Sequence, residues 1–171
     1  MKFIGIIPAR YGSTRFPGKP LADICGKTVI RRVYEQASMA LDTVVVATDD
    51  ERIYDAVEAF GGKVVMTRSD HKCGTDRCLE AYQAITTPSW REQNDNDTVV
   101  INIQGDEPFI QPEQIEALMA CFDQPDTDIA TLVRPYTDKD SKEALENVNT
   151  DRKSTRLNSS HIATSRMPSS A

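Results

Sequence analysis

The chain has 171 residues, of which 39% are hydrophobic, and its formal net charge at pH 7 is -6. One domain with a buried core fits this length and composition, while the acidic balance excludes a general nucleic-acid binder, which needs a basic surface. No apolar run has the length of a membrane span, and the short apolar stretch at the N-terminus does not resemble a secretion signal, so we expect a cytoplasmic protein without a membrane partner.

Apolar runs that alternate with helical patterns predict the order of the elements. The expected strands are residues 3–7, 43–47, 63–66, 98–103 and 129–133, and the expected helices are residues 28–39, 51–60, 76–85 and 112–122. This alternation predicts an α/β fold, with a mostly parallel sheet flanked by helices. Ligands of such sheets bind beyond the carboxyl ends of the strands, so the loops after the strands are the candidate functional segments.

The loop after the first strand, residues 8–20, has the composition of an anion site. Arg10, Arg15 and Lys19 supply positive charge, and they alternate with glycines and hydroxyl residues, including Gly12 and Ser13. Glycines let backbone amides approach an anion closely, and cations and hydroxyls donate hydrogen bonds to it. The spacing matches neither a Walker loop nor a dinucleotide fingerprint, so a solvated basic loop is the alternative.

The four cysteines are Cys25, Cys73, Cys78 and Cys121. They have neither paired CxxC spacing nor the density of a small secreted scaffold, so we expect free thiols. His71 lies close to two of them in sequence, but no second ligand pair follows, and a zinc site is not expected. His71 itself is interpreted as a loop residue rather than as a catalytic base.

The loop after the fourth strand places two carboxylates, Asp106 and Glu107, directly behind a buried strand. Mg²⁺ prefers oxygen ligands and commonly bridges one or two carboxylates to substrate phosphates. A simple strand-ending turn is the alternative. The position at the same edge of the sheet as the cationic loop favours a magnesium site.

Residues 151–171 differ from the rest of the chain, because a basic, serine-rich stretch without apolar periodicity begins at Asp151. Composition alone is typical of a disordered extension. The stretch 151–161 also corresponds to a translation of a widely used sequencing-library adapter. We therefore predict a nucleotide-binding part at residues 1–150 and a non-native, disordered tail at residues 151–171, which is excluded from the fold predictions.

Five ordered motifs within residues 1–150 resemble those of the CMP-Kdo synthetases, the 3-deoxy-manno-octulosonate (Kdo) cytidylyltransferases. The motifs are residues 8–20, residues 47–49, His71, residues 74–77 and residues 104–108. The resemblance implies a fold of the nucleotide-sugar transferase type, with Rossmann-like topology. It also implies a reaction in which CTP and Kdo give CMP-Kdo and diphosphate, for lipopolysaccharide biosynthesis.

The resemblance also implies a role for each matching residue. It assigns Arg10 and Lys19 to the CTP phosphates, beside Gly12 and Ser13 of the same loop. It assigns Gly74, Thr75 and Arg77 to the cytidine side of the pocket, although an exposed first-turn arginine is the alternative for Arg77. Gln104 is assigned to the sugar acid and Asp106 to Mg²⁺. Arg10, Lys19 and Asp106 would then be the catalytic residues, acting by positioning and charge neutralisation.

Two departures from the family pattern accompany the resemblance. Cys73 stands where the family has a small hydroxyl residue. Family members also continue beyond residue 150 with further strands, part of the sugar pocket, a second metal-binding aspartate and the contacts of a homodimer, so we expect a truncated member. The alternatives are another CMP-sugar-acid synthetase of the sialate type, or an inactive nucleotide-binding fragment.

Overall fold

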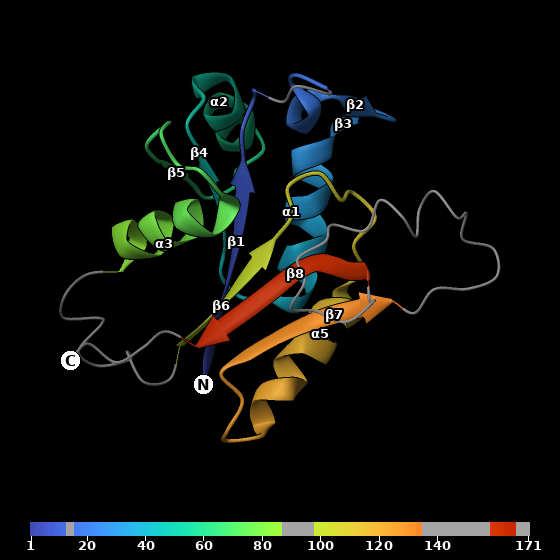
Figure 1. The fold of residues 1–171 in the computed structure, drawn as a ribbon. Coiled ribbons are helices and arrows are strands. Elements are labelled where there is room, and N and C mark those ends of the chain that lie inside the picture. The colour runs from blue at the N-terminus through green and yellow to red at the C-terminus, as the bar shows by residue number, and fades with distance from the viewer. Residues whose placement is uncertain (13–15, 87–97, 135–157, 167–171) are drawn as a thin grey trace.

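The computed structural model describes residues 1–12, 16–86, 98–134 and 158–166, and Figure 1 shows their arrangement. A six-stranded sheet forms the centre of the molecule, with the strand order β5-β4-β1-β6-β8-β7. Its strands are β1 (Lys2–Ala9), β4 (Val44–Thr48), β5 (Val64–Met66), β6 (Thr98–Ile103), β7 (Ile129–Arg134) and β8 (Asn158–Arg166). Ser13 and the other residues of 13–15 lie outside the described residues.

The four strands β5, β4, β1 and β6 are parallel, which confirms the prediction of a mostly parallel sheet. Their apolar runs are explained by burial on both faces of the sheet. All five residues of β4 are buried, as are Ile4, Ile6 and Ile7 of β1. The carboxyl ends of β1 and β6 therefore meet at one edge of the sheet.

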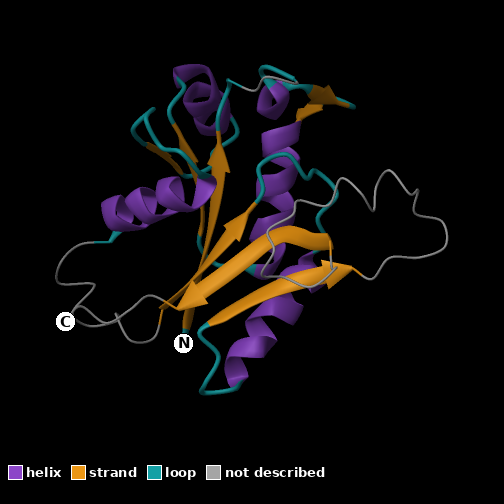
Figure 2. Cartoon of the chain, in the orientation of Figure 1, coloured by secondary structure: helices purple, strands orange, loops and turns teal. Residues whose placement is uncertain are grey.

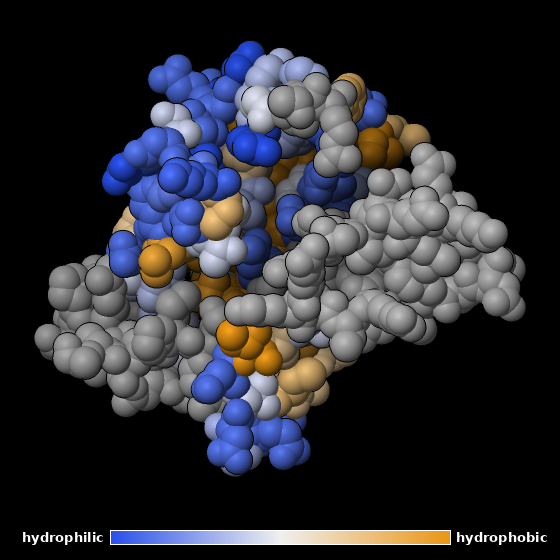
Figure 3. Space-filling view, viewed as in Figure 1, coloured by the Kyte–Doolittle hydropathy of each residue, from blue (hydrophilic) through white to orange (hydrophobic). Residues whose placement is uncertain are grey.

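Helices cover both faces of this sheet (Figure 1). The core on one face includes residues of α1 (Val29–Ala40), α2 (Glu51–Ala59) and α5 (Pro112–Ala120), and the core on the other face includes residues of α3 (Gly74–Ile85). Figure 3 shows mainly hydrophilic side chains over the outer surfaces of α2 and α3, as expected for helices that bury one side. None of the described helices combines the length and the apolar content needed to cross a lipid bilayer.

Figure 2 shows small elements between β1 and α1 that the sequence patterns do not predict. A 3-10 turn, η1 (Lys19–Leu21), follows the cationic loop, and a hairpin of β2 (Asp23–Ile24) and β3 (Lys27–Thr28) precedes α1. The last predicted helix is also shorter than expected, because its final residues form the 3-10 turn η3 (Cys121–Asp123). These elements have only two or three residues each, too few to give an apolar period.

The strand β8 lies in the tail that was predicted to be disordered. It pairs antiparallel with β6 on one side and with β7 on the other. Because β8 lies between β6 and β7, its backbone supplies hydrogen-bond partners to one edge of each of these two strands. The structure therefore differs from the expectation for residues 158–166, while the origin of the tail in an adapter sequence stays a prediction.

Candidate active site

A cavity of about 320 Å³ lies at the carboxyl ends of β1 and β6, beside the first turn of α3. Its lining residues are Pro8, Ala9, Arg10, Lys19, Pro20, His71, Lys72, Cys73, Gly74, Arg77, Gln104, Gly105 and Asp106. Six predicted site residues thus come together there: Arg10, Lys19, Gly74, Arg77, Gln104 and Asp106. Gly12 and Thr75 are exposed and outside this lining.

A larger cavity, of about 790 Å³, lies at the opposite end of the sheet. Residues from the amino ends of the parallel strands line it, such as Phe3 and Val64, together with Leu41. None of the described site residues predicted from the sequence belongs to it. The smaller cavity is the better candidate for an active site, because parallel sheets bind ligands at the carboxyl ends of their strands.

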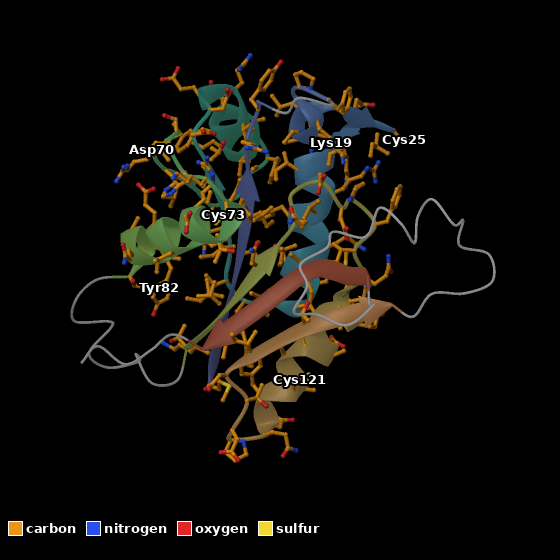
Figure 4. The ribbon with its side chains drawn as sticks, viewed as in Figure 1. Lys19, Cys25, Asp70, Cys73, Tyr82 and Cys121 are labelled. Atoms are coloured by element: carbon orange, nitrogen blue, oxygen red, sulfur yellow. The ribbon has the colours of Figure 1, made fainter. Side chains whose placement is uncertain are left out.

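Lys19 and Asp106 face each other across the mouth of the smaller cavity. The Nζ atom of Lys19 donates to Oδ2 of Asp106 at 2.7 Å, and the two side chains are 41% and 46% exposed. Such an exposed ion pair contributes little to the stability of the fold. Its relevance here is that it places a cation next to a carboxylate at the candidate site. Figure 4 shows Lys19 and Cys73 on either side of β1.

Gly105 explains how the loop after β6 comes so close to the loop after β1. A Cβ atom at this position would lie 2.9 Å from the carbonyl oxygen of Pro8 and 3.3 Å from a methyl group of Ile7. The distance to the Pro8 oxygen is too short for a Cβ atom, and this oxygen belongs to the backbone of β1, so only glycine fits here without a shift of the backbone. Glycine at position 105 therefore lets Asp106 approach the cationic loop.

Arg77 is buried beneath the cavity, with 4% of the residue exposed. Its guanidinium donates to Oδ2 of Asp49 at 3.0 Å, to Oγ1 of Thr67 and to the carbonyl oxygen of Arg68 at 3.3 Å. These contacts join α3 to the segments that follow β4 and β5. The alternative of an exposed first-turn arginine is therefore wrong, because three partners hold the guanidinium inside the protein.

His71 lines the cavity and is held from behind by Glu80 of α3. The Nε2 atom of His71 hydrogen-bonds with Oε2 of Glu80, and the backbone N–H of Arg68 donates to the same carboxylate at 3.1 Å. The hydrogen bond with His71, and to a lesser extent the one from Arg68, holds the pKa of Glu80 below its ordinary value. Glu80 thus fixes the loop that forms one wall of the cavity.

Sequence patterns do not indicate Glu80, since its spacing of nine residues from His71 matches no ligand or catalytic motif. Nor do they indicate Lys72, which lines the cavity. Asp49 belongs to one of the motifs that carry the resemblance, but its pairing with Arg77 depends on a contact across 28 residues. Such long-range contacts have no local sequence pattern.

A metal ion at this site would need ligands beyond the described residues. No three His, Cys, Asp or Glu side chains cluster closely enough to hold one within residues 1–12, 16–86 and 98–132. Asp106 is the carboxylate that lines the cavity. A single exposed carboxylate fits Mg²⁺, which keeps several waters and takes other oxygens from substrate phosphates.

The chain is similar to nucleotidyltransferases in sequence and in structure. The model of a family described as cytidylyltransferase matches residues 4–165. A 3-deoxy-manno-octulosonate cytidylyltransferase of Phocaeicola vulgatus is 64% identical over 149 residues, which are 87% of this chain and 56% of the relative. An 8-amino-3,8-dideoxy-manno-octulosonate cytidylyltransferase of Shewanella frigidimarina is 52% identical over 143 residues, or 81% of this chain and 56% of the relative.

A solved structure also resembles the whole fold. It is a CMP:2-keto-3-deoxy-manno-octonic acid synthetase complexed with CTP, with a TM-score of 0.74 and 38% sequence identity. The match covers 97% of this chain and 74% of that structure. In contrast, the chain spans about half the length of the curated relatives that it matches.

Proposed function

The chain belongs to the cytidylyltransferase family, and we propose that its smaller cavity binds CTP and transfers the CMP group to the sugar acid Kdo. The products would be CMP-Kdo and diphosphate. The Lys19–Asp106 pair across the cavity mouth is the observation that supports this proposal most, because it joins the predicted phosphate loop to the predicted metal ligand. The proposal includes a cytoplasmic location, where CTP is available.

The reaction requires no protein nucleophile. The anomeric hydroxyl of Kdo attacks the α-phosphorus of CTP, the new O–P bond forms as the bond to the β-phosphate oxygen breaks, and the hydroxyl proton passes to solvent. Arg10 and Lys19 line the cavity and would neutralise the charge that grows on the departing diphosphate. The protein would contribute mainly positioning and electrostatic stabilisation.

Asp106 would hold Mg²⁺, which supplies charge neutralisation on the phosphates when it is bound. In the structure the Asp106 carboxylate accepts from Lys19 instead, so CTP binding would exchange this internal ion pair for contacts to phosphate and cation. Because both side chains are nearly half exposed, the exchange requires little desolvation.

Gln104 would contribute to the sugar-acid side, and Gly74 and Arg77 to the cytidine side. These three residues line the cavity. Gly74 begins α3, whose first backbone N–H groups have no partner within the helix; Cys73 caps the N–H of Asp76. Arg77 would act by holding the wall of the cavity, because its guanidinium is already shared among Asp49, Thr67 and Arg68.

The test measures CTP binding by calorimetry and diphosphate release with CTP, Mg²⁺ and Kdo, with each component omitted in turn. We expect CTP to bind and release to require all three components. Asp106→Asn should reduce release far more than CTP binding, and Asp42→Asn, at the opposite end of the sheet, should change neither. If Asp106→Asn changed diphosphate release and CTP binding equally and only slightly, the proposed metal role of Asp106 would be contradicted.

Replacement of Kdo separates the alternatives. Release with sialic acid and not with Kdo would favour a sialate-type synthetase, and a preference for 8-amino-3,8-dideoxy-manno-octulosonate would favour the activity for which the Shewanella relative is named. CTP binding without release under any condition would favour a nucleotide-binding fragment. A homodimer is also part of the proposal for full-length members, and sedimentation of this chain would show whether residues 1–171 form a dimer without the further contacts.

A further inference from the structure

The loop that carries the predicted phosphate ligands closes on itself through Tyr11 and Gly18. The backbone N–H of Gly18 donates to the carbonyl oxygen of Tyr11 at 2.8 Å. Gly18 has a φ of 72°, and a Cβ atom there would lie 3.0 Å from two atoms of the Tyr11 ring. The ring therefore lies directly against the Gly18 backbone, one residue before Lys19.

The same ring is in contact with α2 through Arg52. The Cζ atom of Arg52 lies 3.4 Å from the centroid of the Tyr11 ring, the distance of a stacked guanidinium. Asp50 accepts two hydrogen bonds from this guanidinium, at 2.9 Å from Nε and 2.7 Å from the terminal nitrogen. Both ends of the contact are thus fixed in position.

Asp50 is itself firmly held. Its side chain caps the N-terminus of α2 by accepting from the backbone N–H of Arg52 at 3.1 Å. The hydrogen bonds from the Arg52 side chain lower the pKa of Asp50, so the carboxylate is charged at neutral pH. A chain of contacts therefore runs from the start of α2 through Arg52, whose side chain is 60% exposed, to the Tyr11 ring.

We propose that Arg52 is a positioning residue for the phosphate loop, which acts through Tyr11 and Gly18 to fix the start of η1 and hence the place of Lys19. Arg52 is not among the described residues that line the cavity, so its effect on the ligand is indirect. The part of the proposal that concerns CTP rests on the proposed function. Lysine would not replace Arg52 fully, because it lacks the planar group that both stacks on a ring and forms two parallel bonds to a carboxylate.

A double-mutant cycle tests whether Arg52 acts through Tyr11. The variants are Arg52→Ala, Tyr11→Ala and the double variant, and Arg52→Lys serves as the conservative replacement. Arg31→Ala is the matched control, because Arg31 also lies over a ring, with its Cζ atom 5.7 Å from the centroid of Phe60, and pairs with Glu35, but on α1. Thermal unfolding of each variant would confirm that it folds.

Two measurements are made on each variant. One is the rate of tryptic cleavage after Arg10, which directly precedes Tyr11, read by fragment mass; this rate reports opening of the loop without any ligand. The other is the dissociation constant for CTP. We expect Arg52→Ala to raise the cleavage rate and to weaken CTP binding by about threefold each, the size typical of an exposed cation–π contact. The Arg31→Ala control should change neither.

The outcomes separate the two proposals. If Arg52→Ala has no further effect in the Tyr11→Ala background, Arg52 acts through the ring as proposed. Fully additive effects on CTP binding, or complete rescue by Arg52→Lys, would mean that Arg52 acts by its charge, and would overturn the proposal. If the unaltered chain binds no CTP, the proposed function fails, while an unchanged cleavage rate in Arg52→Ala would independently overturn the positioning role.

Discussion

The guanidinium of Arg77 and the carboxylate of Asp49 form an ion pair at 3.0 Å beneath the candidate active site, and their side chains are only 5% and 18% exposed. Arg77 lies in the first turns of α3, and Asp49 directly follows β4. The pair therefore connects the helix on one face of the sheet to the edge where the loops of the candidate site emerge. Thr67, which also accepts from Arg77, extends the connection to the segment after β5.

Removal of Arg77 should destabilise the fold strongly. Arg77→Ala leaves the partly buried carboxylate of Asp49 and the buried hydroxyl of Thr67 without this partner, and we expect the free energy of unfolding in urea to fall by about 2–3 kcal/mol. Arg68→Ala is the control, because the Arg68–Asp70 pair is exposed and should contribute little. A loss no larger than that of the control would show that the Arg77–Asp49 pair is not important for stability.

The prediction of the sheet from the sequence succeeded where burial determines the pattern. The run 98–103 predicts β6 with its observed bounds, because a strand buried on both faces needs apolar residues almost throughout. The meeting of Lys19 and Asp106 also follows from the rule that parallel strands end at one edge, although their catalytic roles stay predictions.

Contacts between distant side chains could not be predicted in this way. The sequence around Arg77 is compatible with an exposed position, and only the folded chain brings Asp49 within reach. The contact of Arg52 with Tyr11 likewise depends on how α2 docks beside η1. The strand β8 has no counterpart among the predicted strands, because the match of residues 151–161 to a translated adapter excludes the whole tail from the fold predictions.

The thiol of Cys78 should be almost unreactive in the folded protein. Burial raises its pKa to about 12, whereas Cys25, Cys73 and Cys121 are exposed. At pH 8 the thiolate fraction of Cys78 is then lower than that of an ordinary cysteine by on the order of a thousandfold. We expect a thiol-specific chromogenic reagent to titrate three groups rapidly in native protein and all four in urea. Rapid reaction of a fourth native thiol would contradict this expectation.

Acid should destabilise the protein partly through Glu80. The hydrogen bond with His71 holds the pKa of Glu80 below its ordinary value of 4.5, so the folded state favours the charged carboxylate. This contribution is fully present above the pKa of the unfolded chain and is lost as the pH falls through the lower pKa of the folded state. Below about pH 4.5, the free energy of unfolding of Glu80→Gln should decline less steeply than that of the unaltered chain.

Glu116→Gln is the control for this comparison, because Glu116 lies exposed on α5, away from the cavity wall. Its pH dependence should match that of the unaltered chain. An equally steep acid decline in Glu80→Gln would show that the contact with His71 does not stabilise the carboxylate in solution. The comparison is made by urea unfolding at a series of pH values, so that each variant serves as its own reference at neutral pH.

The hairpin before α1 offers a stabilising substitution at Cys25. This residue has a φ of 51° and is followed by Gly26 with a φ of 79°, so both turn residues are left-handed between the paired strands β2 and β3. Side chains other than glycine are strained there, but asparagine tolerates this conformation best, and Asn-Gly is the preferred pair in such two-residue turns. Cys25→Asn should relieve about 1 kcal/mol and raise the Tm by about 2–4 °C.

Cys121→Asn is the matched control, since Cys121 is also exposed but has an ordinary φ of -62°. The same change of side chain should give no gain in Tm at that position. Arg32 donates to the carbonyl oxygens of Ile24 and Cys25, so the hairpin is held against α1 and its strain cannot be released by local rearrangement alone. A Tm that stays constant or falls in Cys25→Asn would therefore mean that the left-handed conformation at position 25 is not retained in solution.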